Sequence, residues 1–183
     1  MPWRDGGGVT TEIAIDPAAA TVSSNFTWRL SSARVEASGP FSRFPGCLRD
    51  LVLLEGAGFE LTVGSRTFDF CDFLNPVRFS GDDSTRARLL QGPSVDLGLI
   101  WDPHRIRAEV STLRVGEDRL RVDLAPTTLL VAPGGGIVLE SPNLELGVMD
   151  TLRFDGVETD PCPSLRATMG SAPLVVIRMW PSP

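Results

Sequence analysis

The chain has 183 residues, enough for one substantial domain or two small ones, and its 42% hydrophobic content is that of a globular protein. A net charge of −6 and singly scattered arginines argue against a nucleic-acid or anionic-membrane partner, because either surface needs a basic patch. Lysine and tyrosine are absent, which excludes a Schiff-base lysine and a phenolic acid or base.

Short apolar runs separated by turn residues recur along the whole chain, which holds 18 glycines and 15 prolines. No stretch of a dozen residues keeps the 3.6-residue period of a helix. We therefore predict an all-β protein. The predicted strands are Thr11–Ile15, Phe26–Ala33, Leu48–Leu54, Phe59–Val63, Arg66–Cys71, Val95–Ile100, Leu120–Leu124, Thr128–Val131, Ile137–Leu139, Leu144–Val148, Leu165–Thr168 and Leu174–Met179.

The apolar runs and the cysteines indicate the compartment. No run approaches the roughly 18 residues of a membrane span, and the N-terminal segment has no apolar signal region. Cys47, Cys71 and Cys162 are odd in number and lack metal-site spacing, which favours free thiols in a reducing compartment. We expect a cytoplasmic protein.

Three pairs of segments in the two halves resemble each other, in the same order and at a nearly constant separation. They are "LLEGAGFEL" (53–61) with "LLVAPGGGIVL" (129–139), "VRFSGD" (77–82) with "LRFDGV" (152–157), and "GPSVDLGLI" (92–100) with "GSAPLVVIR" (170–178). This pattern indicates a tandem duplication of a β unit. Such units suit a jelly roll or barrel whose inner faces enclose a small cavity.

The segments 1–13, 28–63 and 79–99 resemble the HutD/Ves family. The resemblance implies a bicupin, with a first cupin-like barrel over 1–108 and a second over 109–183. Family members usually carry a strand before the Met-Pro-Trp segment, so the true N-terminus would lie upstream of Met1 or the first barrel would lack an edge strand. They also usually carry Asn and Met in the region that Gly98 and Ile100 hold here.

Cupins usually bind a metal through a His-x-His pair, a carboxylate and a later histidine. Laid on this chain, Ser42-Arg43-Phe44 falls on the His-x-His pair and Arg49 on the carboxylate. Serine and phenylalanine cannot replace imidazole ligands, an arginine repels a cation, and His104 is the one histidine of the chain. We therefore predict no metal site and no cofactor.

Arg49 lies at the head of a strand, "LRDLVLLEG" (48–56), that is apolar on both faces. Alternation places it on one face with Leu51 and Leu53. A buried guanidinium keeps its proton and needs an anionic or strongly polar partner. That partner is either structural, such as Asp50 or Glu12, or a ligand carboxylate, and the position on the vacated metal-ligand site favours the ligand.

Arg29 raises the same question on "FTWRLSSARV" (26–35), where it shares a small polar face with Ser31. That face is either a pocket wall or an exposed sheet surface. The candidate ligand-binding residues are Arg49, Arg29, Ser31, Ser42, Phe44, Trp3, Gly7 and Gly8, the glycines through their backbone amides.

These observations favour a metal-free protein that binds a small carboxylic acid. The family resemblance implies sensing or modulation of an intermediate of histidine utilisation, such as N-formylglutamate or urocanate. No catalytic residue is predicted. The alternatives are a small enzyme, an isomerase or hydrolase of such an acid, and an interaction module without a ligand. The sequence leaves the oligomeric state open, with a homodimer among the options.

Overall fold

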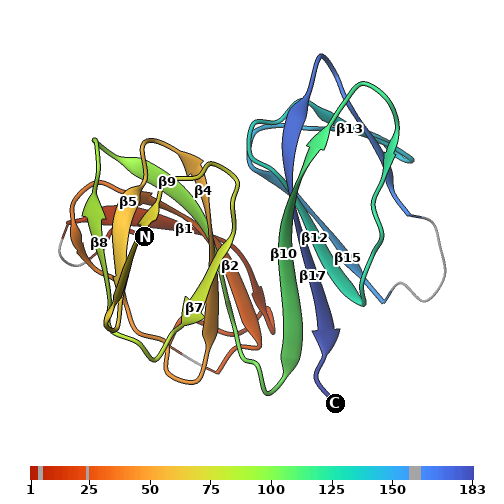
Figure 1. Cartoon of the computed structure of the whole chain (residues 1–183). Helices are drawn as coiled ribbons and strands as arrows, with labels where there is room; N and C mark the ends of the chain where they lie inside the picture. Colours follow the sequence, from red (N-terminus) through yellow and green to blue (C-terminus); the bar gives the residue numbers. More distant parts are fainter. Residues whose placement is uncertain (4–5, 24, 157–161) are drawn as a thin grey trace. The chain divides into compact units, whose positions relative to one another are not determined.

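The computed structural model describes residues 1–3, 6–23, 25–156 and 162–183. These residues form strands, turns and irregular segments, which confirms the all-β prediction (Figure 1). None of them belongs to a helix, so the described structure contains no helix that is long and apolar enough to cross a membrane.

The chain divides into two compact units, Met1–Ile106 (unit 1) and Arg107–Pro183 (unit 2). The division at 108/109 that the sequence indicates stays a prediction. The described strands up to Trp101 are β1 (Gly8–Asp16), β2 (Trp28–Val35), β3 (Gly39–Pro40), β4 (Leu48–Glu55), β5 (Phe59–Val63), β6 (Arg66–Phe70), β7 (Val77–Ser80), β8 (Thr85–Leu89) and β9 (Ser94–Trp101).

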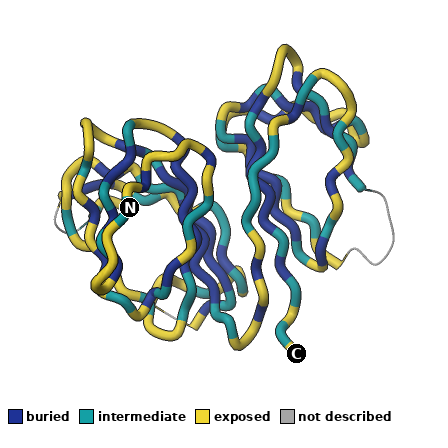
Figure 2. The backbone as a smooth tube through the Cα atoms, viewed as in Figure 1, coloured by how far each residue is buried: buried dark blue, intermediate teal, exposed yellow. Residues whose placement is uncertain are grey.

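Unit 1 is built from two antiparallel sheets, with strand orders β1-β2-β9-β4-β7 and β3-β8-β5-β6. Side chains of both sheets meet in one apolar core, and Figure 2 shows how buried and exposed positions follow each other along the strands. The buried members of this core are Val35, Leu51, Leu53, Phe59, Leu61, Val63, Phe70, Phe79 and Ala87.

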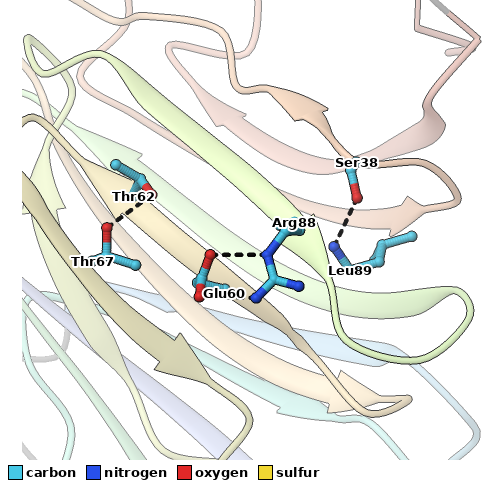
Figure 3. Close-up of polar contacts among 6 residues, drawn as sticks. All are labelled: Ser38, Glu60, Thr62, Thr67, Arg88 and Leu89. Atoms are coloured by element: carbon cyan, nitrogen blue, oxygen red, sulfur yellow. Dashed lines mark hydrogen bonds and ion pairs between the residues drawn. The ribbon is translucent and has the colours of Figure 1, made fainter.

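The second sheet of unit 1 shows how alternation in the sequence sets its two faces. In β5 every second residue is buried, and Glu60 and Thr62 are only partly buried. Across the neighbouring strands Arg88 donates to both carboxylate oxygens of Glu60 at 3.0 Å, and the hydroxyls of Thr62 and Thr67 are 3.0 Å apart (Figure 3). Nearby, the Ser38 hydroxyl accepts from the Leu89 amide. This face is therefore polar, and the apolar face points into the core.

Unit 2 has two four-stranded sheets, β10-β17-β12-β15 and β11-β16-β13-β14. Buried residues from both sheets form a separate apolar core. The strands are β10 (Ile106–Val115), β11 (Leu120–Arg121), β12 (Thr127–Ala132), β13 (Ile137–Glu140), β14 (Asn143–Leu146), β15 (Asp150–Asp155), β16 (Ser164–Ala167) and β17 (Ala172–Pro181).

The strand orders of the two units repeat position for position, as the duplication predicts. The order β2-β9-β4-β7 of unit 1 matches β10-β17-β12-β15, and β3-β8-β5-β6 matches β11-β16-β13-β14. The similar segments of the sequence lie on matching strands: β4 and β5 with β12 and β13, β7 with β15, and β9 with β17. Strand β1 extends the first sheet of unit 1 and has no counterpart in the described sheets of unit 2.

Candidate functional site

A cavity of about 580 Å³ lies in unit 1. This volume fits one small molecule. Its wall is formed by the inward residues of β2, β4 and β9, the segment 40–44 and the N-terminal residues. The lining residues are Met1, Pro2, Trp3, Thr10, Val22, Arg29, Ser31, Ala33, Pro40, Phe41, Ser42, Phe44, Arg49, Leu51, Asp96, Gly98 and Ile100.

The register of the five-stranded sheet places the charged lining residues. Arg29 on β2 and Arg49 on β4 both lie opposite Ile100 of the strand between them. Gly98 and Asp96 follow on the same face of β9, because every second residue of a strand points to the same side. The two arginines and one carboxylate therefore line one cavity, although they are far apart in the sequence.

Arg49 is 9% exposed, and its guanidinium is only partly satisfied by the protein. Its Nη1 donates to the backbone oxygen of Ser42 at 3.1 Å. Its Nε is buried and has no hydrogen-bond partner among the described residues. The rings of Phe41, Phe44 and Phe79 lie 5.2–5.5 Å from the guanidinium carbon, within cation–π range.

The structural partners expected for Arg49 are bound to other arginines. Asp50 accepts from the Nε of Arg78 at 2.8 Å. Glu12 accepts from the Nε of Arg29 at 2.7 Å. Arg29 therefore has a carboxylate partner within the chain, whereas Arg49 has none among the described residues. The sequence leaves a structural partner and a ligand carboxylate open for Arg49. The structure excludes Asp50 and Glu12, the two structural partners named above, because each is paired with another arginine.

Asp96 is the lining residue that the sequence reasoning missed. It is 3% exposed, and no hydrogen bond or ion pair reaches its carboxylate from the described part of the chain. Burial raises the pKa of Asp96 to about 7, although the charge of Arg49 lowers it. The available signal was one acidic residue inside the apolar run "SVDLGLI" (94–100).

Arg49 stays positively charged at neutral pH. Burial lowers its pKa to about 10, with Asp96 acting in the opposite direction and Arg29 adding to the decrease. Near its guanidinium, Arg49 attracts an anionic group and repels a metal ion.

Five of the remaining predicted residues also line the cavity: Arg29, Ser31, Ser42, Phe44 and Trp3. Arg29 and Ser31 are buried, so their polar face is a cavity wall and not an exposed sheet surface. The Trp3 Nε1 donates to the Thr10 hydroxyl at 2.7 Å, which fixes the indole at the wall.

Gly7 and Gly8 are not among the described residues that line the cavity, so their part in ligand binding stays a prediction. The Gly7 carbonyl accepts the amides of Glu36 and Ala37, which ties this segment to the end of β2. A Cβ on Gly8 would lie 2.3 Å from the Arg34 carbonyl oxygen. The absence of a side chain at Gly8 therefore allows the close approach of β1 to β2.

The residues present do not fit the metal that many cupins carry. Ser42, Phe44 and Arg49, which fall on the positions of cupin ligands, do line one cavity. They offer a hydroxyl, an aromatic ring and a cation, and none of these side chains is a good ligand for a divalent metal. The described residues also contain no cluster of three or more His, Cys, Asp or Glu side chains that could hold an ion.

Unit 2 provides an internal comparison for Arg49. In unit 1, Arg49 lies opposite Phe79 of β7. In unit 2, Thr128 lies opposite Phe154 of the matching strand. Thr128 therefore occupies the position of Arg49, and its hydroxyl is satisfied locally by the Ala125 carbonyl and amide.

The same register gives the counterparts of Gly98 and Asp96. Gly98 lies opposite Leu51, and Val176 lies opposite Leu130. Val176 thus matches Gly98, and Leu174, two residues earlier, matches Asp96. Both are fully buried in the core of unit 2. The fold is therefore compatible with apolar residues at these positions, and the polar cavity is a property of unit 1.

Comparison with known proteins agrees with this architecture. The HutD family model matches residues 1–169. An uncharacterized 21.2 kDa protein in the hutC 3′ region of Pseudomonas putida is 36% identical, over 85% of this chain and 82% of its own length. Protein Ves of Escherichia fergusonii is 35% identical, over 59% of this chain and 56% of its own length.

Solved structures give the same result. A conserved protein of unknown function from Pseudomonas aeruginosa PAO1 superposes with a TM-score of 0.85 at 32% identity, over 100% of this chain and 94% of its own. HutD from Pseudomonas fluorescens SBW25, in a formate condition, gives 0.78 at 33% identity, over 98% and 93%. A cupin 2 conserved barrel domain protein from Leptotrichia buccalis shares the fold alone, with a TM-score of 0.55 at 8% identity over 93% and 88%. The chain has a cupin-type fold and belongs to the HutD family.

Proposed function

We propose that unit 1 binds a small carboxylic acid, with Arg49 as the residue that pairs with the carboxylate. The observation that carries the proposal is the buried Nε of Arg49, which has no partner among the described residues and belongs to a side chain that lines the cavity. Buried polar groups normally have a hydrogen-bond partner, so an orphaned donor at a cavity needs an explanation. A bound anion supplies one.

The contacts of Arg49 show which of its donors already has a partner and which lacks one. Nη1 is held by the Ser42 carbonyl. The Nε and Nη2 hydrogens form the other edge, and the two donors of that edge match the two oxygens of a carboxylate. A bidentate contact of this kind needs no movement of Ser42. The three phenylalanine rings around the guanidinium would support it on its apolar sides.

We propose further that the protein senses or modulates such an acid in the cytoplasm without a metal. The HutD family match and the relative in a hutC 3′ region support a connection with histidine utilisation. Acids of the N-formylglutamate or urocanate kind are therefore the first candidates, and both are small enough for a cavity of about 580 Å³.

Calorimetric titration of N-formyl-L-glutamate and urocanate into wild type, Arg49→Met and Arg88→Met tests the proposal. We expect Arg49→Met to weaken binding about tenfold to a hundredfold, because a charge-assisted contact contributes roughly 1.5–3 kcal/mol. Arg88→Met is the matched control, since Arg88 pairs with Glu60 and does not line the cavity. It should bind like wild type.

Two results would contradict the proposal. One is equal affinity of wild type and Arg49→Met for an acid that binds. The other is that neither acid, nor any other small carboxylate in a thermal-shift screen, binds the wild type.

Asp96 supports a second candidate function, an isomerase or hydrolase of such an acid. A pKa of about 7 allows a carboxylate to accept and donate a proton near neutral pH. Proton NMR of each acid incubated with the protein would separate the two functions. Conversion of the acid by wild type but not by Asp96→Asn would show that the protein is an enzyme. An acid that binds but gives an unchanged spectrum would support the binding protein.

A further inference from the structure

Carboxylate binding by Arg49 does not involve Asp96, the buried acidic side chain of the cavity wall. Its side chain lines the same cavity and is 3% exposed. Arg29, the other cation of the wall, is already paired with Glu12. No ion pair joins Asp96 and Arg49 among the described residues, although each influences the pKa of the other.

The register separates the two groups along the sheet. Arg49 lies opposite Ile100, four residues from Asp96 on β9. Four residues of strand span about 13 Å, of which the long arginine side chain covers part. Gly98 lies between them on the same face and has no side chain to fill the space. A molecule that reaches both Arg49 and Asp96 therefore needs a different group for each.

The chemistry of Asp96 defines the second group. Above its pKa of about 7 the Asp96 carboxylate is ionised and accepts hydrogen bonds only, and none of the described residues donates one to it. In that state its charge balances that of Arg49, and Arg29 is paired with Glu12, so a bare carboxylate adds an uncompensated negative charge. An N–H donor on the same ligand offsets that charge where it faces Asp96.

We infer that Asp96 is a specificity-determining residue that accepts a hydrogen bond from an N–H group of the bound acid. The ligand class is a small carboxylic acid that carries an N–H donor several ångströms from its carboxylate. This inference rests on the proposed function, because it takes Arg49 as the carboxylate partner. The register-matched residue of unit 2, Leu174, offers no such acceptor.

Two acids that differ in the N–H donor test the inference. Urocanate carries an imidazole N–H, and trans-3-(3-furyl)acrylate has the same acrylate group on a ring without one. We expect wild type to bind urocanate at least tenfold more tightly, because a site built around a hydrogen bond discriminates against an analogue that lacks it.

Asp96→Ala removes the acceptor and should bring the affinity ratio of the two acids close to one. Asp96→Leu, which introduces the residue of unit 2, serves if the alanine variant does not fold. Arg49→Met should weaken both acids by a similar factor and leave their ratio unchanged. These opposite patterns distinguish the residue that binds the carboxylate from the residue that selects the ligand.

Three other outcomes would contradict either the role of Asp96 or the proposed function. Equal affinity of wild type for the two acids, with both dependent on Arg49, would overturn the role of Asp96 and leave the proposed function. A ratio that persists in the Asp96 variants would do the same. Failure of wild type to bind either acid would count against both the inference and the proposed function with these probes.

Discussion

Arg49 and Arg78 lie on paired strands of one sheet, yet their surroundings predict opposite effects on stability. The Nε of Arg78 is bound to Asp50, a carboxylate that is 3% exposed. The Nε of Arg49 has no partner among the described residues. A buried cation without an ion-pair partner is a cost to the folded state, which the aromatic contacts of Arg49, its hydrogen bond to Ser42 and the charge of Asp96 offset only in part.

We expect Arg49→Met to leave the free energy of unfolding of the ligand-free protein within about 1 kcal/mol of wild type, since it replaces an uncompensated charge by an apolar side chain. Arg78→Met should lower it by about 1–3 kcal/mol, because it leaves the buried Asp50 carboxylate with fewer hydrogen bonds. Urea unfolding measures both. A loss of 3 kcal/mol or more in Arg49→Met would show that Arg49 has a structural partner after all.

Asp96 makes stability depend on pH in the direction opposite to an ordinary paired carboxylate. Its pKa in the folded protein is about 7, against an ordinary value of 3.8. Between these values the folded protein keeps a proton that the unfolded chain releases, so the contribution of Asp96 is fully present below about pH 4 and is lost as pH rises to about 7. Arg49, whose charge acts on Asp96, stays charged over this range.

Asp96→Asn does not titrate, so its free energy of unfolding minus that of wild type should increase from pH 4 to pH 7 and stay constant above about pH 8. The shift of about three pH units limits the increase to about 4 kcal/mol. Urea unfolding of both proteins across this range provides the measurement. A difference that does not vary with pH would show that Asp96 is solvated or paired.

At the scale of the element, β9 is the strand that keeps the cavity open. Both of its faces are largely buried, and Gly98 lies between the inward residues Asp96 and Ile100. A Cβ at Gly98 would meet the Cδ2 of Leu51 at 3.2 Å, a contact with the end of a flexible side chain. Its counterpart Val176 fills the same position in the core of unit 2.

Gly98→Val should therefore fill the floor of the cavity without unfolding the protein. We expect binding of urocanate or N-formyl-L-glutamate to fall at least tenfold, and the free energy of unfolding to stay within about 1 kcal/mol of wild type, because glycine is itself unfavourable in a strand. Titration and urea unfolding of the same preparation measure the two effects. Unchanged affinity would place the ligand away from β9.

The elements also show what a single sequence can predict. Alternation within "LRDLVLLEG" correctly grouped Arg49 with Leu51 on one face of β4. Alternation could not predict which face of β9 points inward, because both faces of that strand are apolar. The pairing of β9 with β2 and β4 determines the inward face. Ion-pair partners were missed for the same reason, since Arg78 and Asp50 meet only through strand register.

Two other differences between prediction and structure concern strands that were not predicted and the glycines near the N-terminus. The predicted strands omit β3, β7, β8, β15 and the longer β10 (Ile106–Val115). At the start of β10, Ile106 and Ala108 are buried and the charged residues after them are exposed. This alternation of apolar and charged residues is visible in the sequence. The glycine run near the N-terminus was placed at the cavity, whereas Gly8 serves the approach of two backbones.

The two units of the duplicated fold differ at matching positions of their inner faces. In unit 1 these positions hold residues that line the cavity, and in unit 2 they hold buried residues. The positions of Arg49, Gly98 and Asp96 are held in unit 2 by Thr128, Val176 and Leu174, each fully buried. The units therefore share a strand order and differ in what their inner faces can bind.

We expect one molecule of acid to bind per chain, because the counterpart of Arg49 in unit 2 is Thr128, an uncharged residue whose hydroxyl is already hydrogen-bonded to Ala125. The stoichiometry from calorimetric titration with urocanate measures this. Two equivalent sites per chain would show that unit 2 also binds the acid. Binding would then not require Arg49, Gly98 and Asp96, which unit 2 lacks.

We expect the unpaired Nε–H of Arg49 to bind the ligand carboxylate, and proton–nitrogen correlation NMR of the arginine Nε–H groups detects this contact. The Arg49 signal is assigned by its loss in Arg49→Met. On addition of urocanate or N-formyl-L-glutamate, we predict that this signal moves downfield and exchanges more slowly with water, as a new hydrogen bond requires, while the signal of Arg29, already bound to Glu12, moves less. A titration in which an acid binds and the Arg49 signal stays in place would contradict the claim.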